Sequence, residues 1–254
     1  MKKNTVLIIN PVSVNIMKAI YNALVINMLD IIILGDRKII YALCMELNLD
    51  IGQLQIIDLL QLDDISVKVD EYTRMKEIKG IIIDDNISGK LIKKINTRHI
   101  CSIIDYGIFL KSIFIIKYKN TNELMKNINE TIEILNNLNQ NNINIGLIGS
   151  KKETICKIKK EIKEKIKIKK VDLININKIS KIKYNIIIFE DKIEEMVYTN
   201  SIINKALVRT VEIRKASNMF IFDAKGKSLK NVFIQLLFIS KIDKLSNEVN
   251  SKVI

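Results

Sequence analysis

The stretch DIIILGDRKII (30–40) decides the fold of this chain. Its unbroken apolar run over 30–34 predicts a buried strand, which Gly35-Asp36 closes before a predicted helix over 37–48. A turn of this kind can direct backbone amides and a helix N-terminus toward an anion. Alternatively, Gly35 only makes the turn and Asp36 caps the helix, and the spacing alone favours this second interpretation.

The alternation of strand and helix continues on both sides of this stretch. Further strands are predicted at 6–10, 54–58, 80–84, 99–104, 112–117, 142–149, 184–190 and 218–222. Further helices are predicted at 12–27, 88–96, from Asn120 onward with Glu123 as its capping partner, 151–164, 196–211 and 227–242. Because the strand segments are unbroken apolar runs, we expect a soluble α/β protein with a mainly parallel sheet. Ligands should then bind beyond the carboxyl ends of the strands.

The composition gives little support for a nucleic-acid or membrane partner. Lys and Arg number 41 against 28 Asp and Glu, a net charge of +13, but the excess is spread along a chain rich in Ile, Lys and Asn. In the one basic run, 157–170, isoleucines alternate with lysines, which indicates an amphipathic helix leading into a solvated edge strand. The longest late apolar run, 232–239, is too short to span a membrane. We therefore expect a cytoplasmic protein that does not bind nucleic acid.

The candidate chemical motifs are individually weak. The three cysteines are widely spaced and there is one histidine, His99, so neither a disulfide framework nor a Cys/His metal site is expected. GLIGSKKE (146–153) lacks the spacing of a phosphate-binding P-loop and is better explained as a turn with Ser150 as a helix cap. Asp84-Asp85 follows a strand and could hold Mg²⁺, but a polar turn is the simpler interpretation.

Taken together, three segments resemble the phosphate acetyl/butyryl transferase family. They are ALVINMLDIIILGDRKIIYALCMELNLDIGQLQIID (23–58), GIIIDDNISGKLIKKI (80–95) and YNIIIFEDKIEEMVYTNSIINKALV (184–208). The resemblance implies two α/β domains of the isocitrate/isopropylmalate dehydrogenase type, one formed by 1–97 with about 226–254 and an inserted one of about 98–225. It also implies a homodimer that transfers acyl groups between coenzyme A and phosphate. Coenzyme A thioester is then a substrate, and no cofactor or metal is required.

The resemblance also assigns candidate site residues. His99 and Ser88 are the candidate catalytic residues, and the candidate substrate-binding residues are Gly35, Asp36, Lys205, Lys225 and Lys227. Several positions depart from the family pattern. The Met-Lys-Gly motif is replaced by Ile83-Asp84-Asp85, so an acid stands where the family has lysine, and Asp223–Lys227 replaces a segment whose arginine helps to bind phosphate.

These departures leave three interpretations open. The first is a phosphate acyltransferase with altered sites, which converts acyl-CoA and phosphate into acyl phosphate and coenzyme A. The second is a catalytically inactive relative that acts as a binding or regulatory protein. The third, which the sequence supports least, is an unrelated basic α/β protein that binds nucleic acid.

Overall fold

The computed structural model describes most of the chain as two compact units. The described residues are 3–50, 52, 54–74, 78–84, 88–95, 97–105, 112–117, 120–138, 140, 142–149, 152–166, 168, 170–174, 184–189, 208–216 and 219–241. Unit 1 comprises Met1–His99 and Ile213–Ile254, and unit 2 comprises Ile100–Glu212. The chain therefore passes between the units inside two strands, β5 (Arg98–Asp105) and β10 (Val208–Ala216).

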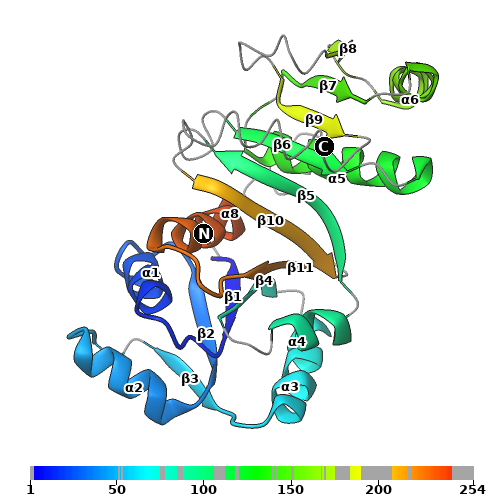
Figure 1. The fold of residues 1–254 in the computed structure, drawn as a ribbon. Coiled ribbons are helices and arrows are strands. Elements are labelled where there is room, and N and C mark those ends of the chain that lie inside the picture. The colour runs from blue at the N-terminus through cyan, green and yellow to red at the C-terminus, as the bar shows by residue number, and fades with distance from the viewer. Residues whose placement is uncertain are drawn as a thin grey trace, which may run out of the picture. The chain divides into compact units, whose positions relative to one another are not determined.

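Unit 1 contains a parallel sheet with strand order β3-β2-β1-β4-β11 (Figure 1). Its strands are β1 (Thr5–Ile9), β2 (Asp30–Gly35), β3 (Gln55–Asp58), β4 (Ile78–Ile83) and β11 (Met219–Asp223). Neighbouring strands in this order pair in parallel, and the end of β10 pairs with β11 in the antiparallel direction. The prediction of a mainly parallel sheet is confirmed.

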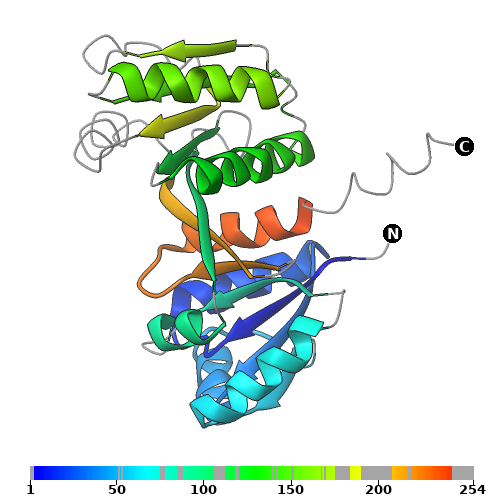
Figure 2. The same ribbon diagram turned by 90° about the vertical axis from the view of Figure 1, so that its right-hand side faces the viewer.

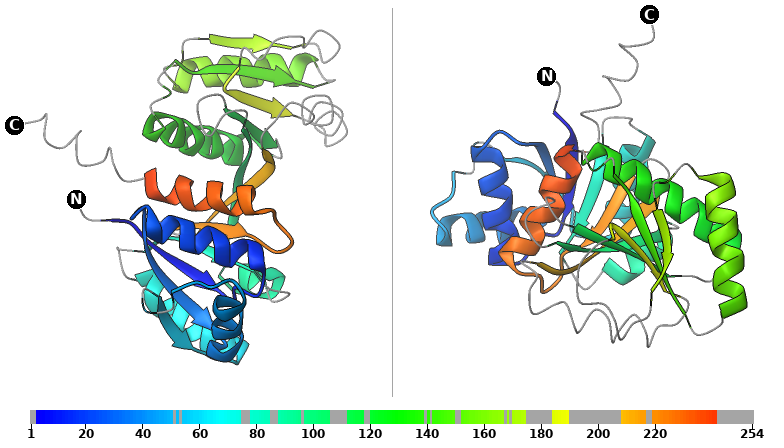
Figure 3. Two further views of the ribbon diagram at one scale, coloured as in Figure 1. Left: turned by 90° about the vertical axis from the view of Figure 1, so that its left-hand side faces the viewer. Right: turned by 90° about the horizontal axis from the view of Figure 1, so that it is seen from above.

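Helices cover both faces of this sheet (Figures 2 and 3). On one face α1 (Val14–Val25) packs against α8 (Leu229–Lys241), and Ile239 of α8 lies directly over Gly80 of β4. On the other face, α3 (Leu62–Arg74) and α4 (Ser88–Lys94) bury Ile65, Val69 and Leu91 against alternate strand residues such as Leu7 and Ile81. Helix α2 (Arg37–Glu46) also belongs to unit 1. Burial on both faces explains why the strand sequences are continuously apolar.

Unit 2 repeats this architecture with strand order β5-β6-β9-β7-β8. Its further strands are β6 (Ser112–Lys117), β7 (Asn144–Ile148), β8 (Lys170–Leu173) and β9 (Ile186–Phe189), and the helices among its described residues are α5 (Thr121–Asn137) and α6 (Lys152–Lys165). The β5–β6 pair is antiparallel and the other pairs are parallel. The capping pair at the start of α5 is confirmed, because the Glu123 amide donates to Asn120 Oδ1 at 2.8 Å. The basic run 157–170 continues α6 and leads to the edge strand β8, as predicted.

Two elements differ from the sequence prediction. Helix α3 is absent from the sequence prediction because the β-branched residues Ile65, Val67 and Val69 alternate as they do in a strand. In the structure Val67 is 60% exposed, and of these three only Ile65 and Val69, one helical turn apart, are buried. The predicted helix over 196–211 is wrong at 208–211, where β10 begins. Its period-2 burial, with Glu212 exposed between Val211 and Ile213, is typical of a strand. Positions 196–207 lie outside the described residues.

Gly35 offers a test of how closely the strand ends of unit 1 pack. A Cβ atom on Gly35 would lie 2.7 Å from Asn10 Oδ1 and 3.2 Å from Asn10 Cα, and the Asn10 backbone is itself held in the left-handed region (φ 45°). We predict that Gly35→Ala lowers the free energy of unfolding by about 1–3 kcal/mol, because backbone must move to relieve the overlap. Urea denaturation measures this change.

Gly89, in helix α4, is the matched control because a Cβ atom there meets nothing within 4 Å. Gly89→Ala should leave stability unchanged or raise it by up to about 1 kcal/mol, since alanine is the better helix former. Equal effects of the two substitutions would contradict the close approach of Gly35 to Asn10.

Candidate functional site

The carboxyl ends of the parallel strands of unit 1 form the edge at which ligands bind in α/β folds. Four aspartates lie at the ends of strands along this edge or directly after them: Asp36, Asp58, Asp84 and Asp223. Each of them accepts a hydrogen bond from at least one backbone amide. We call these four residues the aspartate edge.

Two members of the aspartate edge occupy the N-terminus of helix α2. Asp36 Oδ1 accepts from the amides of Lys38 at 2.8 Å and Ile39 at 3.3 Å. Asp58 Oδ1 accepts from the amide of Arg37 at 3.0 Å. The first three amides of α2 therefore already have carboxylate partners, and the interpretation of Asp36 as a helix cap is confirmed.

Asp84 ties the end of β4 to the start of α1. Its side chain is 2% exposed, and Oδ2 accepts from the amides of Val12 at 3.1 Å and Ser13 at 2.8 Å. The Asp84 amide in turn donates to the carbonyl of Ile9 at 3.1 Å. This contact lies between β1 and β4, where the direction of chain winding reverses and where open α/β sheets place their ligands. At this position the Asp84 carboxylate accepts hydrogen bonds from two backbone amides.

The lysines proposed to bind substrate lie elsewhere on the edge, after β11. Asp223 Oδ1 accepts from the Lys225 amide at 3.1 Å, and the Lys227 carbonyl accepts from Asn15 Nδ2 at 3.2 Å. The Lys225 side chain is exposed. β1 and β4 separate β11 from β2, a distance of about 14 Å at about 4.8 Å per strand. The structure therefore does not bring Lys225 and Lys227 beside Gly35 and Asp36.

The other sequence-predicted site residues have different positions. His99 is a half-buried residue near the start of β5, and Ser88 is the first residue of α4, whose side chain is not described. Lys205 and Asp85 lie outside the described residues. The roles assigned to these residues from the family resemblance remain predictions.

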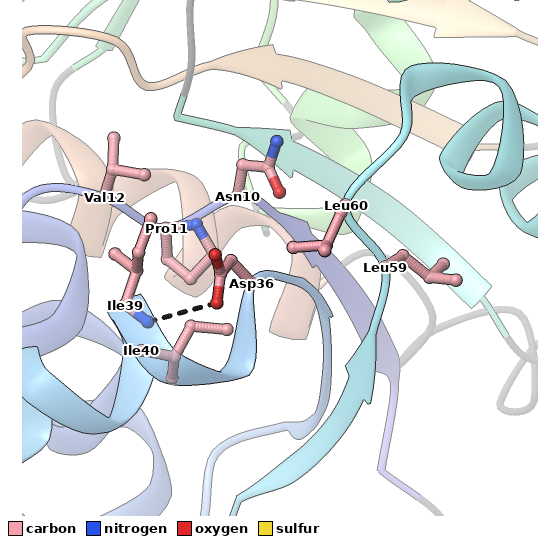
Figure 4. A pocket seen from close by; sticks show the side chains of 8 residues that line it. All are labelled: Asn10, Pro11, Val12, Asp36, Ile39, Ile40, Leu59 and Leu60. Atoms are coloured by element: carbon pink, nitrogen blue, oxygen red, sulfur yellow. Dashed lines mark hydrogen bonds between the residues drawn. The ribbon is translucent and has the colours of Figure 1, made fainter.

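A pocket of about 190 Å³ opens between the ends of β1, β2 and β3 (Figure 4). Its polar lining residues are Asn10 and Asp36. Its apolar lining residues are Pro11, Val12, Ile39, Ile40, Leu59 and Leu60. Gly35-Asp36 is the part of this region that is recognisable as a candidate from the sequence, since the chain around Asn10-Pro11 and after Asp58 contains no recognisable ligand motif.

Other kinds of site find no support in the described part of the chain. Among those residues no group of three or more His, Cys, Asp or Glu side chains is placed to hold a metal ion. No helix in the same residues has the length and hydropathy needed to cross a membrane. The Cys101 thiol is buried, and its burial raises the pKa to about 12 despite a hydrogen bond with Thr131, so it is a poor nucleophile.

Solved structures of two phosphotransacylases are similar to this chain in fold. The EutD phosphotransacetylase of Staphylococcus aureus superposes with a TM-score of 0.64 at 12% sequence identity, covering 94% of each chain. A branched-chain phosphotransacylase of Enterococcus faecalis gives a TM-score of 0.65 at 10% identity, covering 94% of this chain and 99% of that one. This chain has the phosphotransacylase fold.

The same fold extends to dehydrogenases, as the resemblance implied. A 4-hydroxythreonine-4-phosphate dehydrogenase from Burkholderia phymatum gives a TM-score of 0.58 at 10% identity, covering 95% of this chain and 99% of that one. No protein-family model and no curated protein sequence matches the chain. The phosphotransacylase likeness proposed from three sequence segments is therefore confirmed at the level of the fold.

Asp84 provides a test of the aspartate edge. We predict that Asp84→Ala lowers the free energy of unfolding by about 3 kcal/mol, because it leaves the Val12 and Ser13 amides without their charged acceptor. Asp84→Asn, which keeps an acceptor oxygen without the charge, should lose less. Guanidinium denaturation at neutral pH measures both.

Asp63 is the control for this test, since its side chain is 91% exposed and pairs with the exposed Lys94 at 3.2 Å. Asp63→Ala should cost less than about 1 kcal/mol, as surface ion pairs generally do. A cost for Asp84→Ala no greater than that for Asp63→Ala would show that Asp84 does not hold the start of α1.

Proposed function

We propose that this chain is a phosphate acyltransferase-like protein that no longer transfers acyl groups to phosphate and serves as a binding or regulatory protein. The observation that supports the proposal is the aspartate edge. In α/β proteins, phosphate groups bind to backbone amides at helix N-termini and strand ends. Here Asp36, Asp58 and Asp84 accept hydrogen bonds from five such amides, those of Arg37, Lys38, Ile39, Val12 and Ser13.

Carboxylates at these positions act against phosphate in two ways. They occupy the donors that phosphate would use, and they repel it, by about 4 kcal/mol per unit charge at 4 Å separation for an effective dielectric constant of about 20. Asp84 also replaces the lysine that the family resemblance leads us to expect at this position. Losing even one donor to the transition state typically lowers the rate by about 10²–10³.

The direct test is phosphate-dependent release of coenzyme A. Purified protein is mixed with acetyl-CoA or butyryl-CoA and inorganic phosphate, and free thiol is followed with a chromogenic disulfide. A known phosphotransacetylase serves as the positive control. We expect no thiol release above the rate without protein over a wide range of both substrates. Sustained release that requires phosphate would contradict the proposal and establish the chain as an active acyltransferase.

Binding of coenzyme A is the part of the family property that we propose to persist. We predict that coenzyme A raises the melting temperature of the protein in a concentration-dependent way, since a ligand present at 100 times its Kd adds about 2.7 kcal/mol to the stability. Pantetheine and AMP, tested separately, show which half of the molecule is recognised. No shift with any of the three would remove coenzyme A from the proposal while leaving the thiol-release result unaffected.

A homodimer and a cytoplasmic location complete the proposal. The homodimer follows the family resemblance, and the location follows the odd number and wide spacing of the cysteines, which do not form a disulfide pattern. All three cysteines have free thiols, two of them buried, which fits a reducing compartment.

A further inference from the structure

The pocket beside α2 has an apolar floor and an open apolar rim. Ile40 is 1% exposed and Pro11 is buried, so both present fixed surfaces, whereas Leu60 at the rim is 66% exposed. In Figure 4 the Asp36 side chain lies near the middle of the labelled residues, with Pro11 and Ile40 on one side and Leu60 on the other. A ligand in this pocket therefore contacts aliphatic groups, the side-chain amide of Asn10 and one carboxylate.

The charge distribution around the pocket selects against anions. The amides of α2 that could attract an anion already bond to Asp36 and Asp58. The guanidinium of Arg37 donates to the carbonyl of Ile56 at 3.1 Å, and Arg37 does not line the pocket. The pocket is thus negative in character although it opens at a helix N-terminus.

The second oxygen of Asp36 remains available to a ligand. Both amides that cap α2 donate to Oδ1, and within the described part of the chain Oδ2 accepts no hydrogen bond. A carboxylate oxygen next to apolar walls suits a donor that carries a positive charge, because a charge-assisted hydrogen bond is about twice as strong as a neutral one.

We propose that this pocket binds a small aliphatic ammonium compound, with the ammonium group on Asp36 Oδ2 and the hydrocarbon against Pro11, Ile40 and Leu60. The size is suitable, since a cavity of about 150 Å³ holds benzene and this pocket has about 190 Å³. A ligand of about six heavy atoms in an open pocket should bind with a Kd on the order of a millimolar. The inference does not depend on the proposed loss of acyl transfer, because it concerns a different ligand.

The test uses three probes of one shape and different charge: 3-methylbutylammonium, 3-methylbutanol and 3-methylbutanoate. Each is titrated into the full-length, ¹⁵N-labelled protein at neutral pH, and chemical shifts are followed by NMR. We expect the ammonium compound to shift the amides of Asn10, Ile39 and Leu60 and to bind about tenfold more tightly than the alcohol. The carboxylate should cause no saturable shift.

Variants connect the preference to Asp36. Asp36→Asn keeps an Oδ1 acceptor for the helix cap but removes the charge, so it should abolish the advantage of the ammonium compound over the alcohol. Asp30→Asn makes the same charge change at the opposite end of β2 and should preserve the advantage. Leu60→Ala, at an exposed position that tolerates truncation, should weaken both probes by the same factor.

Three results would overturn the inference. The first is a carboxylate that binds as tightly as the ammonium compound, and the second is an ammonium preference that survives in Asp36→Asn. The third is a set of shifted amides that lies away from the pocket. If Asp36→Asn fails to fold, the probe series on the unmodified protein and on Leu60→Ala still decides the question. Thiol release is measured separately, so the failure of one proposal leaves the other standing.

Discussion

The carboxyl-end edge of the unit 1 sheet depends on one constraint, which is that backbone amides released at strand ends and helix starts need acceptors. Asp84 satisfies this need for Val12 and Ser13 from a position that is 2% exposed. Because a buried carboxylate without partners would be very costly, the β1–α1 connection and the end of β4 must keep their relative positions. This arrangement fixes the start of α1 and with it the path of Asn10, Pro11 and Val12, which line the pocket.

In this fold the residues that form the apolar core can change independently of the residues that form the aspartate edge. The sheet is held by Ile, Leu and Val on both faces, for example Leu7, Ile9, Ile81 and Ile83 against Ile65 and Val69. Such contacts need only apolar groups of suitable volume, so they persist through extensive sequence change. This explains how a chain with 10–12% identity to two phosphotransacylases retains their fold over 94% of its length. The edge has no comparable tolerance, because each amide requires a specific acceptor or ligand.

The same difference explains what could be predicted from the sequence. Strands β1, β2, β4 and β11 were predictable because burial on both faces makes them continuous apolar runs, and Asp36 was recognisable as a cap from its place directly before a helix. Helix α3 and strand β10 were not predictable from their hydrophobic patterns. In α3 the alternating β-branched residues imitate a strand, and in β10 the charged residues obscure the alternation typical of a strand. The roles of Asp58 and Asp84 could not be predicted, because their partners Arg37, Val12 and Ser13 are 21, 72 and 71 residues away along the chain.

Net charge is a poor guide to the chemistry of this edge. The chain carries +13, which in general favours anionic ligands. Much of the positive charge lies on exposed side chains, and part of it is paired with acids; within unit 1, for example, Lys94 pairs with Asp63 at 3.2 Å. Exposed charges more than about 8–10 Å away are largely screened at physiological salt, whereas a carboxylate within a pocket acts at contact distance. For a ligand at the ends of β1, β2 and β3, the carboxylate of Asp36 therefore makes a larger electrostatic contribution than the net positive charge of the chain. We expect this carboxylate to determine which ligand charge the pocket accepts.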